Sequence, residues 1–279
     1  MGDAVRVRDI AAALEEFAPS ALKEEWDNVG LLVGDPDAQV RKVLVALDAV
    51  DGVVEEASAT GADMIVTHHP IIFGPIKSVT TQTPLGRRVV KLIRHGISVY
   101  AAHTNLDSAR GGTNDILFDM LGLIGREALM GEDADGAGRS PDGELLAHAT
   151  GMGRVGNLPK AMSLSDFAAL VRKKLGAPHV SYGGCDSREV LRVGLCAGAA
   201  CESAFLRAAS RKGCDVYVTG DVKYHKAQEA AELGLCLVDA THYFSEVIVV
   251  PTLREYIARR FAHIDVAVSQ FDGQTMKVI

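Results

Sequence analysis

Three short segments of the chain carry histidines at spacings typical of metal ligands, and in two of them a carboxylate follows four residues later. The candidate residues in these segments are His68, His69, His103, Asp107, His242 and Glu246. Side chains four residues apart lie on one face of a helical turn, and in a tight loop they can also converge. Because imidazole nitrogen and carboxylate oxygen together suit divalent first-row metals, these segments predict a metal site.

The adjacent histidines His68 and His69 follow the apolar run "DMIV" and precede Pro70. A buried imidazole without partners costs roughly 1–3 kcal/mol for each unsatisfied group, so the doublet needs ligands. Adjacent residues of a strand point to opposite faces, and just past a strand end they could hold different ions. Two metals about 3.5–4 Å apart would use six groups economically, which favours a dinuclear site over a single zinc. A lone His-x-x-x-Asp pattern, by contrast, is usually coincidence.

Alternating strands and helices must position these side chains. Apolar runs rich in Val and Leu lead into the polar segments, and helical patterns that end at glycine separate them. We expect strands over 42–49, 62–69, 96–103, 190–198, 214–221 and 235–242, and helices over 7–17, 51–61, 84–95, 111–123, 164–175, 202–213 and 225–234. The segment 247–269 predicts a long helix and a final strand. The pattern predicts two α/β domains with layered mixed sheets and a dinuclear metal site at the carboxyl ends of strands.

The polar, glycine-rich stretch 131–143 indicates a loop or a domain boundary, and a second α/β region follows it. A weak internal echo joins the two regions. "GADMIVTHH" (61–69) parallels "GCDVYVTGD" (213–221), and "ISVYAAHTNLDS" parallels "LCLVDATHYFSE". Either a duplication or a shared βαβ architecture would produce this echo.

Composition narrows the classes of partner. The formal net charge is −7, the wrong sign for general binding to nucleic acid or to a membrane surface. Aromatic residues are sparse, with one Trp, which does not favour a base-stacking platform for nucleic acid. The five cysteines form no CxxC pair, so we expect reduced, mostly buried thiols. The N-terminus lacks a signal-peptide core and no apolar run approaches the roughly 18–20 residues of a transmembrane helix. We therefore expect a cytoplasmic protein.

Other polar positions leave two interpretations open. Asp27 and Asn28 in "EEWDNVG" could hold a turn or could face the site, and Asp48 could cap the next helix. Three cations near the motifs could bind phosphate or lie on a solvated surface: Lys77, Arg110 and Lys223. His225 could line a pocket, whereas the remaining histidines are interpreted as structural or surface residues.

The motifs "EEWDNVGLLVGD", "ADMIVTHHPIIF", "AAHTNLDSARGGTND", "VTGDVKYHKAQEA" and "HYFSE" occur in this order and span most of the chain. Together they resemble the GTP cyclohydrolase 1 type 2 homologue family, also called the NIF3-like family. The resemblance implies a two-domain α/β protein, commonly a ring-shaped homohexamer, with a dinuclear metal site facing an internal cavity. The short segment 123–153 leaves no room for the domain that long members of the family insert.

The resemblance also assigns residues. It implies that His68, His69, Asp107, His242 and Glu246 hold two divalent ions, with Glu246 as the bridge. His103 would lie beside the metals. It places 1–125 plus 241–279 in the metal-binding domain and 126–240 in the second domain. Two departures stand out, since Thr241 replaces a usual glycine and "AGAA" (197–200) replaces a glycine-rich turn, which weakens any anion-binding role for that turn.

The leading hypothesis is a metal-dependent hydrolase with a small-molecule substrate, which could be a nucleotide. By resemblance the reaction is GTP ring opening with formate release, and His103 would act as general acid or base. A phosphoesterase or an amidohydrolase would use the same metals. A second class is a metal-binding or metal-delivery protein without turnover, and a third is a regulatory scaffold. The ligand types accept Zn, Mn, Fe, Ni or Co.

Overall fold

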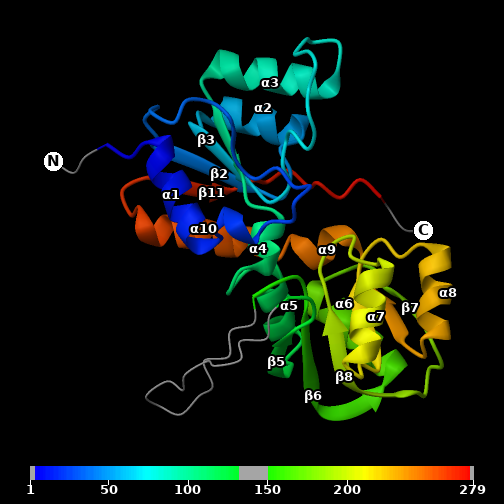
Figure 1. Ribbon diagram of the computed structural model, residues 1–279. Helices are drawn as coiled ribbons and strands as arrows, with labels where there is room; N and C mark the ends of the chain where they lie inside the picture. The colour runs from blue at the N-terminus through cyan, green and yellow to red at the C-terminus, as the bar shows by residue number, and fades with distance from the viewer. Residues whose placement is uncertain (1–3, 132–149, 277–279) are drawn as a thin grey trace, which may run out of the picture. The chain divides into compact units, whose positions relative to one another are not determined.

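The computed structural model describes residues 4–131 and 150–276, which form two compact units (Figure 1). The first unit takes the chain up to Leu106 and again from Val249 to Thr275, and the second consists mainly of Asp107–Ile248. Each unit has a mixed sheet with helices, which confirms the predicted α/β class. Most of the expected boundary segment 131–143 lies outside the described residues.

The sheet of the first unit has the order β1-β4-β3-β2-β11. Its strands are β1 (Gly30–Val33), β2 (Lys42–Ala46), β3 (Met64–Thr67), β4 (Ser98–Ala101) and β11 (Asp265–Val268). Strand β1 runs antiparallel to β4, and the other pairs are parallel. Because the parallel strands are covered on both faces, β3 and β4 are buried along their whole length.

Helices cover both faces of this sheet. They are α1 (Val7–Phe17), α2 (Asp51–Thr60), α3 (Pro84–His95) and α10 (Val249–Arg260), with the short 3-10 helix η1 (Ser20–Leu22) after α1. Figure 1 shows α2 and α3 on one side of the strands and α1 and α10 on the other. Val53, Val54 and Leu92 from α2 and α3 pack with Ile65 and Val99 of the strands. This core fixes the strand ends from which the candidate histidines emerge.

The sheet of the second unit has the order β5-β6-β8-β9-β10-β7. Its strands are β5 (Ile124–Ala128), β6 (Arg154–Ser163), β7 (Ser181–Gly183), β8 (Glu189–Leu195), β9 (Val216–Thr219) and β10 (Cys236–Asp239). Strands β8, β9 and β10 are parallel, whereas β5, β6 and β7 pair antiparallel. The sequence predicts mixed sheets and the segments of β8, β9 and β10, but it did not indicate that the segments of β5, β6 and β7 form strands.

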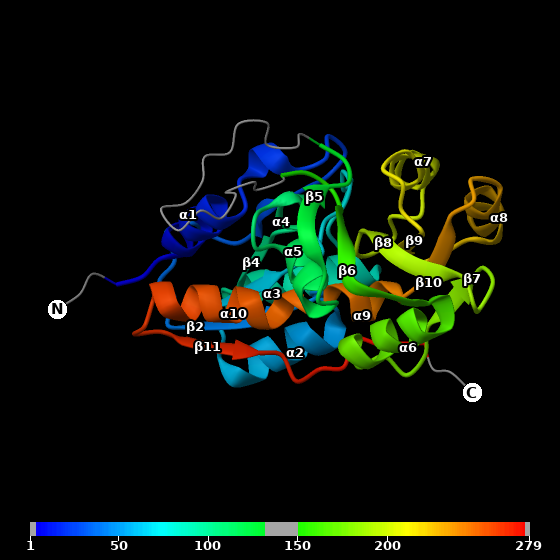
Figure 2. The same ribbon diagram turned by 90° about the horizontal axis from the view of Figure 1, so that it is seen from below.

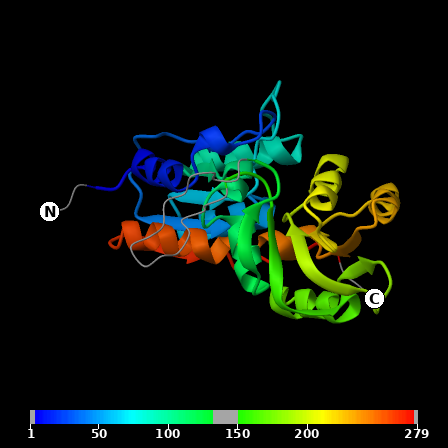
Figure 3. The same ribbon diagram turned by 60° about the horizontal axis from the view of Figure 1, so that its bottom comes forward.

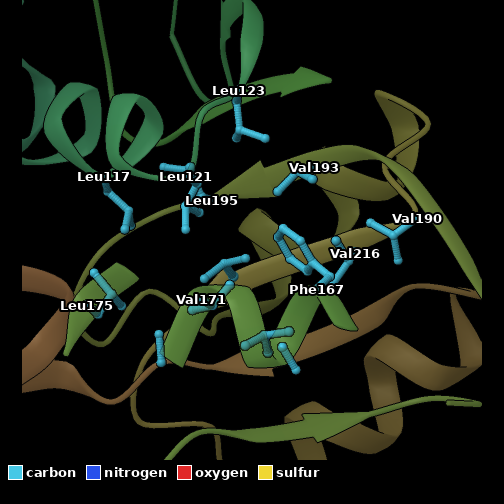
Figure 4. Packing of buried hydrophobic residues seen from close by; sticks show 14 of the residues in the cluster. Leu117, Leu121, Leu123, Phe167, Val171, Leu175, Val190, Val193, Leu195 and Val216 are labelled. Carbon is cyan, nitrogen blue, oxygen red and sulfur yellow. The ribbon is translucent and has the colours of Figure 1, made fainter. Parts of the chain in front are cut away.

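The helices of the second unit are α5 (Thr113–Met120), α6 (Leu164–Leu175), α7 (Ser203–Arg211), α8 (Tyr224–Glu232) and α9 (His242–Glu246). Figures 2 and 3 show α7 and α8 on one side of the parallel strands and α6 on the other. Figure 4 shows Phe167 and Val171 of α6 packed with Val193 and Val216 of the sheet. Ser163 is the N-cap of α6, because its side chain accepts a hydrogen bond from the Asp166 N–H.

The five cysteines are free thiols, four of them buried, and only Cys185 is exposed. Burial raises the pKa of the Cys196 thiol well above its ordinary value, so this group stays protonated and inert. Among the described residues, no helix is both long enough and apolar enough to span a bilayer.

Candidate metal centre

Strand β3 ends at Thr67, and the histidine doublet lies just beyond it. The Thr67 hydroxyl donates to the carbonyl oxygen of His69 at 2.8 Å, and the His69 N–H donates to the carbonyl oxygen of Leu47 at 3.0 Å. These bonds replace the ladder that Pro70 cannot continue, because proline lacks an N–H. The expected position of the doublet past the strand end is confirmed.

Oxygen atoms of the protein hold one nitrogen of each of these two rings. Nδ1 of the fully buried His68 lies 2.9 Å from the carbonyl oxygen of Ala102, and Nδ1 of His69 lies 2.8 Å from Oδ1 of Asp48. A carbonyl oxygen and an ionised carboxylate only accept, so each Nδ1 carries the proton. The lone pair of each neutral ring is then on Nε2, the tautomer that binds a metal through Nε2.

His103 follows β4 and has the same type of partner. Its Nδ1 donates to Oδ1 of Asp27 at 2.9 Å, while the N–H of Thr104 donates to Oδ2 of Asp27 at 3.0 Å. Burial alone would raise the pKa of Asp27, but the hydrogen bonds from His103 and Thr104 outweigh it and hold that pKa well below its usual range. Asp27 is therefore ionised at neutral pH and orients the His103 ring.

The first unit by itself brings three imidazoles together. Ligand nitrogens of His68, His69 and His103 all lie within 4.8 Å of one another. The ring centroids are 5.0 Å apart for the doublet, and His103 is 5.1 Å from His68 and 5.4 Å from His69. Such a group could hold a metal ion, as the doublet and the His-x-x-x-Asp motif predict.

The two His-x-x-x-carboxylate motifs both adopt the helical alternative. Asp107 lies on the short helix α4 (Thr104–Ser108), one turn after His103, and is buried. Its carbonyl oxygen accepts a hydrogen bond from Nδ2 of Asn114 at 3.0 Å. His242 and Glu246 are the first and last residues of α9, another single turn. Four-residue spacing therefore has the same structural basis in both motifs.

Within the second unit, His242 and Glu246 form a pair of ligand atoms. Nε2 of His242 lies 2.9 Å from Oε2 of the buried Glu246, and Nδ1 of His242 donates to Oδ2 of Asp221 at 2.8 Å. Ligand atoms about 2.1 Å from a shared octahedral ion, on neighbouring positions, lie about 3 Å apart. The separation of this pair therefore fits two ligands of one first-row ion.

The backbone of Gly198 lies so close to the Glu246 carboxylate that a larger residue would displace it. A Cβ at Gly198 would lie 1.9 Å from Oε1 of Glu246, and the φ of Gly198 is +69°. The Gly198 N–H donates to Oγ of Ser245 at 3.0 Å, and the Ser245 hydroxyl donates to the carbonyl oxygen of His242 at 2.9 Å. The turn 197–200 thus leaves room for a carboxylate, a role that the sequence alone did not indicate.

Two residues beside this pair adopt positive φ without being glycine. Among the described residues, only Asp221 (φ 53°) and Thr241 (φ 63°) do so. Thr241 occupies the position where the resembled family usually has glycine, and its φ supplies the physical reason for that preference. The hydroxyl oxygen of Thr241 accepts a hydrogen bond from the Phe244 N–H at 3.4 Å, so the residue also caps α9. Strained backbone of this kind is concentrated at functional sites.

Three carboxylates that hold histidines were not assigned that role from the sequence. Asp48 was interpreted as a helix cap, Asp27 was left open, and Asp221 was not singled out. Both Asp48–His69 and Asp221–His242 are separated by 21 residues. In each case the carboxylate and the histidine follow neighbouring parallel strands, β2 with β3 and β9 with β10. A carboxylate one βαβ unit upstream of a candidate histidine is the signal that could have identified Asp48 and Asp221, whereas Asp27 lies 76 residues from His103 and offers no such signal.

The remaining candidates lie outside these groups. Lys77, Arg110 and His225 are exposed, and Lys223 is also exposed, with its Nζ 4.0 Å from Glu202. The donor chemistry of the six main candidates fits divalent first-row metals, because four imidazoles with their Nδ1 atoms held by oxygen are combined with two carboxylates. The structure therefore contains His, Asp and Glu groups able to bind metal.

Comparison with known proteins gives consistent matches over nearly the whole chain. The profile of the Duf34/NIF3 (NGG1p interacting factor 3) family matches residues 5–275. A Clostridium perfringens protein named GTP cyclohydrolase 1 type 2 homolog is 35% identical over 256 residues, which cover 92% of each chain. A Clostridium acetobutylicum protein of the same name is 34% identical and covers 87% of this chain and 85% of its own.

Solved structures show the same fold. A Bacillus cereus protein related to NIF3 superposes with a TM-score of 0.87 at 27% identity, and the match covers 100% of both chains. A Staphylococcus aureus protein superposes with a TM-score of 0.86 at 30% identity, covering 99% of this chain and 100% of that one.

Proposed function

The chain belongs to the Duf34/NIF3 family, and from this premise we propose that it is a metal-dependent hydrolase with two divalent ions. His68, His69, Asp107, His242 and Glu246 would hold these ions. The name of the curated relatives, GTP cyclohydrolase 1 type 2 homolog, supports GTP ring opening as the first reaction to test. The metal could be Zn, Mn, Fe, Ni or Co.

One observation supports the proposal most strongly. Nδ1 of each of four histidines donates to an oxygen of the protein, and for three of them that oxygen belongs to a carboxylate, as the distances of 2.8–2.9 Å show. This arrangement fixes the tautomer, raises the basicity of Nε2, and is the usual environment of histidines that bind metals. A structural histidine needs no such repeated orientation, so four together favour a metal centre.

The chain's own residues supply orientation and proton transfer. Bound divalent ions supply Lewis-acid activation of water and stabilise negative charge. One water opens the imidazole ring of the purine at the carbon between its nitrogens and leaves a formamide, and a second water hydrolyses the formamide to formate and an amine. Nε2 of His103 accepts a proton from the attacking water and returns it to the leaving nitrogen, while Asp27 stabilises the protonated ring.

The experiment pairs elemental analysis with a formate assay. Purified protein should retain up to two divalent ions per chain, and GTP should release formate only while the metal is present. His68→Ala should lower the bound metal and reduce formate release at least 10²-fold, because a ligand is lost. His95→Ala is the matched control, since His95 is exposed on α3 and its Nδ1 bonds only to the carbonyl oxygen of Lys91.

The outcomes separate the rival functions. Unchanged metal content in His68→Ala would remove that residue from the ligand set, and formate release in chelator would exclude metal-dependent hydrolysis. Retained metal without turnover of GTP, of model phosphoesters or of amides would favour a metal-binding or metal-delivery protein. The ring-shaped homohexamer stays a prediction from the family resemblance.

A further inference from the structure

Two large aromatic side chains of the first unit are exposed next to His103. Trp26 is 57% exposed and Phe73 is 55% exposed. Their ring centroids are 5.7 Å apart, with the ring planes inclined by 37°. Exposed apolar residues that stand alone need no explanation, but two aromatic rings in contact with each other form a surface suited to binding.

The surface is continuous with the proposed proton carrier. The ring of His103 lies 6.1 Å from that of Trp26 and 6.3 Å from that of Phe73. In both pairs the planes are close to perpendicular, at 73° and 70°, so the imidazole meets the two larger rings in edge-to-face geometry. We call these three rings the aromatic wall.

One tripeptide holds the wall in place. Trp26 belongs to the wall, its neighbour Asp27 accepts the hydrogen bond of His103, and Nδ2 of Asn28 donates to the carbonyl oxygen of Ile72 at 2.6 Å. The last bond fixes the residue that precedes Phe73. Consecutive residues therefore orient the His103 ring and anchor the backbone beside Phe73, which reduces the order that must be gained when a ligand binds.

We propose that the aromatic wall binds the planar heteroaromatic ring of the small molecule on which the metal centre acts. Stacking on a ring face suits such a ligand and contributes roughly 1–3 kcal/mol per base. A sandwiched ring would need about 7 Å between the flanking rings, twice the stacking distance of about 3.5 Å, so the ligand lies on the wall rather than between Trp26 and Phe73. This inference rests on the proposed function for the identity of the ligand. Binding of the ring, however, does not itself require that the ligand be turned over.

Because Trp26 is the only Trp of the chain, its fluorescence reports on the wall directly. Guanosine 5′-monophosphate, titrated into metal-depleted protein in chelator, should quench this fluorescence saturably, whereas ribose 5-phosphate should not. Phe73→Leu should raise the dissociation constant roughly 5- to 150-fold, and Phe73→Tyr should restore the affinity, since a stacking face returns. Phe271→Leu is the matched control, an exposed aromatic residue of the same unit that is 47% exposed.

Several outcomes would overturn the inference. Equal quenching by ribose 5-phosphate would assign the signal to the phosphate, and an unchanged affinity of Phe73→Leu would remove the wall from the site. A drop in solution mass in Phe73→Leu, without any effect of the nucleotide, would show that a second copy of the chain covers the wall. His69→Ala should lose metal but keep the quenching. In the unaltered, metal-loaded protein, ring binding without formate release would contradict the proposed reaction alone.

Discussion

Each histidine of the proposed centre donates a hydrogen bond from Nδ1 to an oxygen of the protein. The type of oxygen determines how firmly the ring is oriented. His68 relies on a carbonyl oxygen of the backbone, whereas the other three rings rely on Asp48, Asp27 and Asp221. An ionised carboxylate makes the stronger hydrogen bond and stabilises a protonated ring. Of the three carboxylates, Asp27 accepts hydrogen bonds on both of its oxygens, from His103 and from the backbone N–H groups of Asn28 and Thr104.

Asp27→Asn should therefore destabilise the metal-free protein in a pH-dependent manner. The folded protein holds the pKa of Asp27 well below its ordinary value, so the stabilisation from its ionised form is full above about pH 5 and is lost as the pH falls toward the folded pKa. At pH 7 we expect a loss of about 1–3 kcal/mol in the free energy of unfolding, because buried donors lose a charged acceptor. Urea denaturation in chelator at pH 7 and pH 3 measures the loss, which should shrink at pH 3.

The control for this prediction is Asp272→Asn, a change at an exposed carboxylate of the same unit. It should alter the free energy of unfolding by less than about 0.5 kcal/mol at either pH. If the loss in Asp27→Asn were the same at pH 7 and pH 3, the ionised carboxylate would not be the source of the stabilisation.

At this scale the sequence predicted the ligand types but not the groups that hold them. His68, His69, His103, Asp107, His242 and Glu246 are recognisable because their spacing is local, at one or four residues. Their partners are distant in the chain: Asp27 and His103 are 76 residues apart. Gly198 likewise contacts Glu246 only in the folded chain. Such pairs leave no local pattern, because tertiary structure alone brings them together.

At the scale of elements, the single turn α9 presents two candidate ligands and is bounded by tight backbone contacts. It begins after Thr241 at positive φ and packs against the turn that contains Gly198. Both positions restrict the residue types allowed there, one because of its φ and the other because of the neighbouring carboxylate. Each can be tested by a single substitution with a matched control.

Gly198→Ala should lower metal affinity at least tenfold. The new methyl group would lie 1.9 Å from Oε1 of Glu246, so the carboxylate must move away from the position it takes beside His242. The control is Gly176→Ala, which has a similar φ of +64° but no atom within 4 Å of the new methyl group. It should cost about 1 kcal/mol of stability and leave the metal affinity unchanged. Competition with a fluorescent chelator measures the affinity, and equal losses in both variants would refute the steric argument.

Thr241→Gly should stabilise the protein by about 1–2 kcal/mol. Its backbone angles, φ 63° and ψ 153°, fall in a region that glycine occupies almost exclusively and that costs other residues about 1–3 kcal/mol. Glycine keeps most of the N-cap stabilisation, losing only a few tenths of a kcal/mol. The matched change Thr252→Gly, inside α10, should instead destabilise by about 0.3–0.5 kcal/mol, the difference in helix propensity between the two residues. Chemical denaturation distinguishes these signs, and destabilisation by Thr241→Gly would show that the side chain outweighs the strain.

Elements with strong apolar periodicity were predicted well, and the polar strands were not. The helix expected over 7–17 coincides with α1, and Gly61 ends α2 in left-handed conformation, as its position predicts. Gly96, which was expected to begin a strand, instead ends α3 in the same conformation. Strand β6 was missed because Gly156 and Pro159 interrupt its sequence, and its pairing with β8 shifts register between Asn157 and Met162. Such irregular strands form because they pair with a neighbouring strand of the sheet, and their own sequence pattern does not predict them.

At the scale of the whole chain, the weak sequence similarity between the two regions has a structural counterpart in each unit. Strands β2, β3 and β4 lie side by side in parallel, and β1 pairs antiparallel with β4. In the second unit β8, β9 and β10 lie side by side in parallel, and β7 pairs antiparallel with β10. The candidate histidines follow β3, β4 and β10, so the same strand ends carry the chemistry in both units. The predicted domain limits, 1–125 plus 241–279 and 126–240, stay a prediction.

The proposed ligand set gives a prediction for metal binding by the whole chain. A ligand that binds only the folded state adds about 2.7 kcal/mol to stability at 100 times its dissociation constant. If the proposed ligands hold metal ions, saturating metal should slow amide hydrogen exchange in β3 and in β9 alike. His242→Ala should remove the added protection in both strands, although it changes only the second unit. Protection confined to β3 in metal-loaded protein would instead indicate that the three imidazoles of the first unit bind an ion alone.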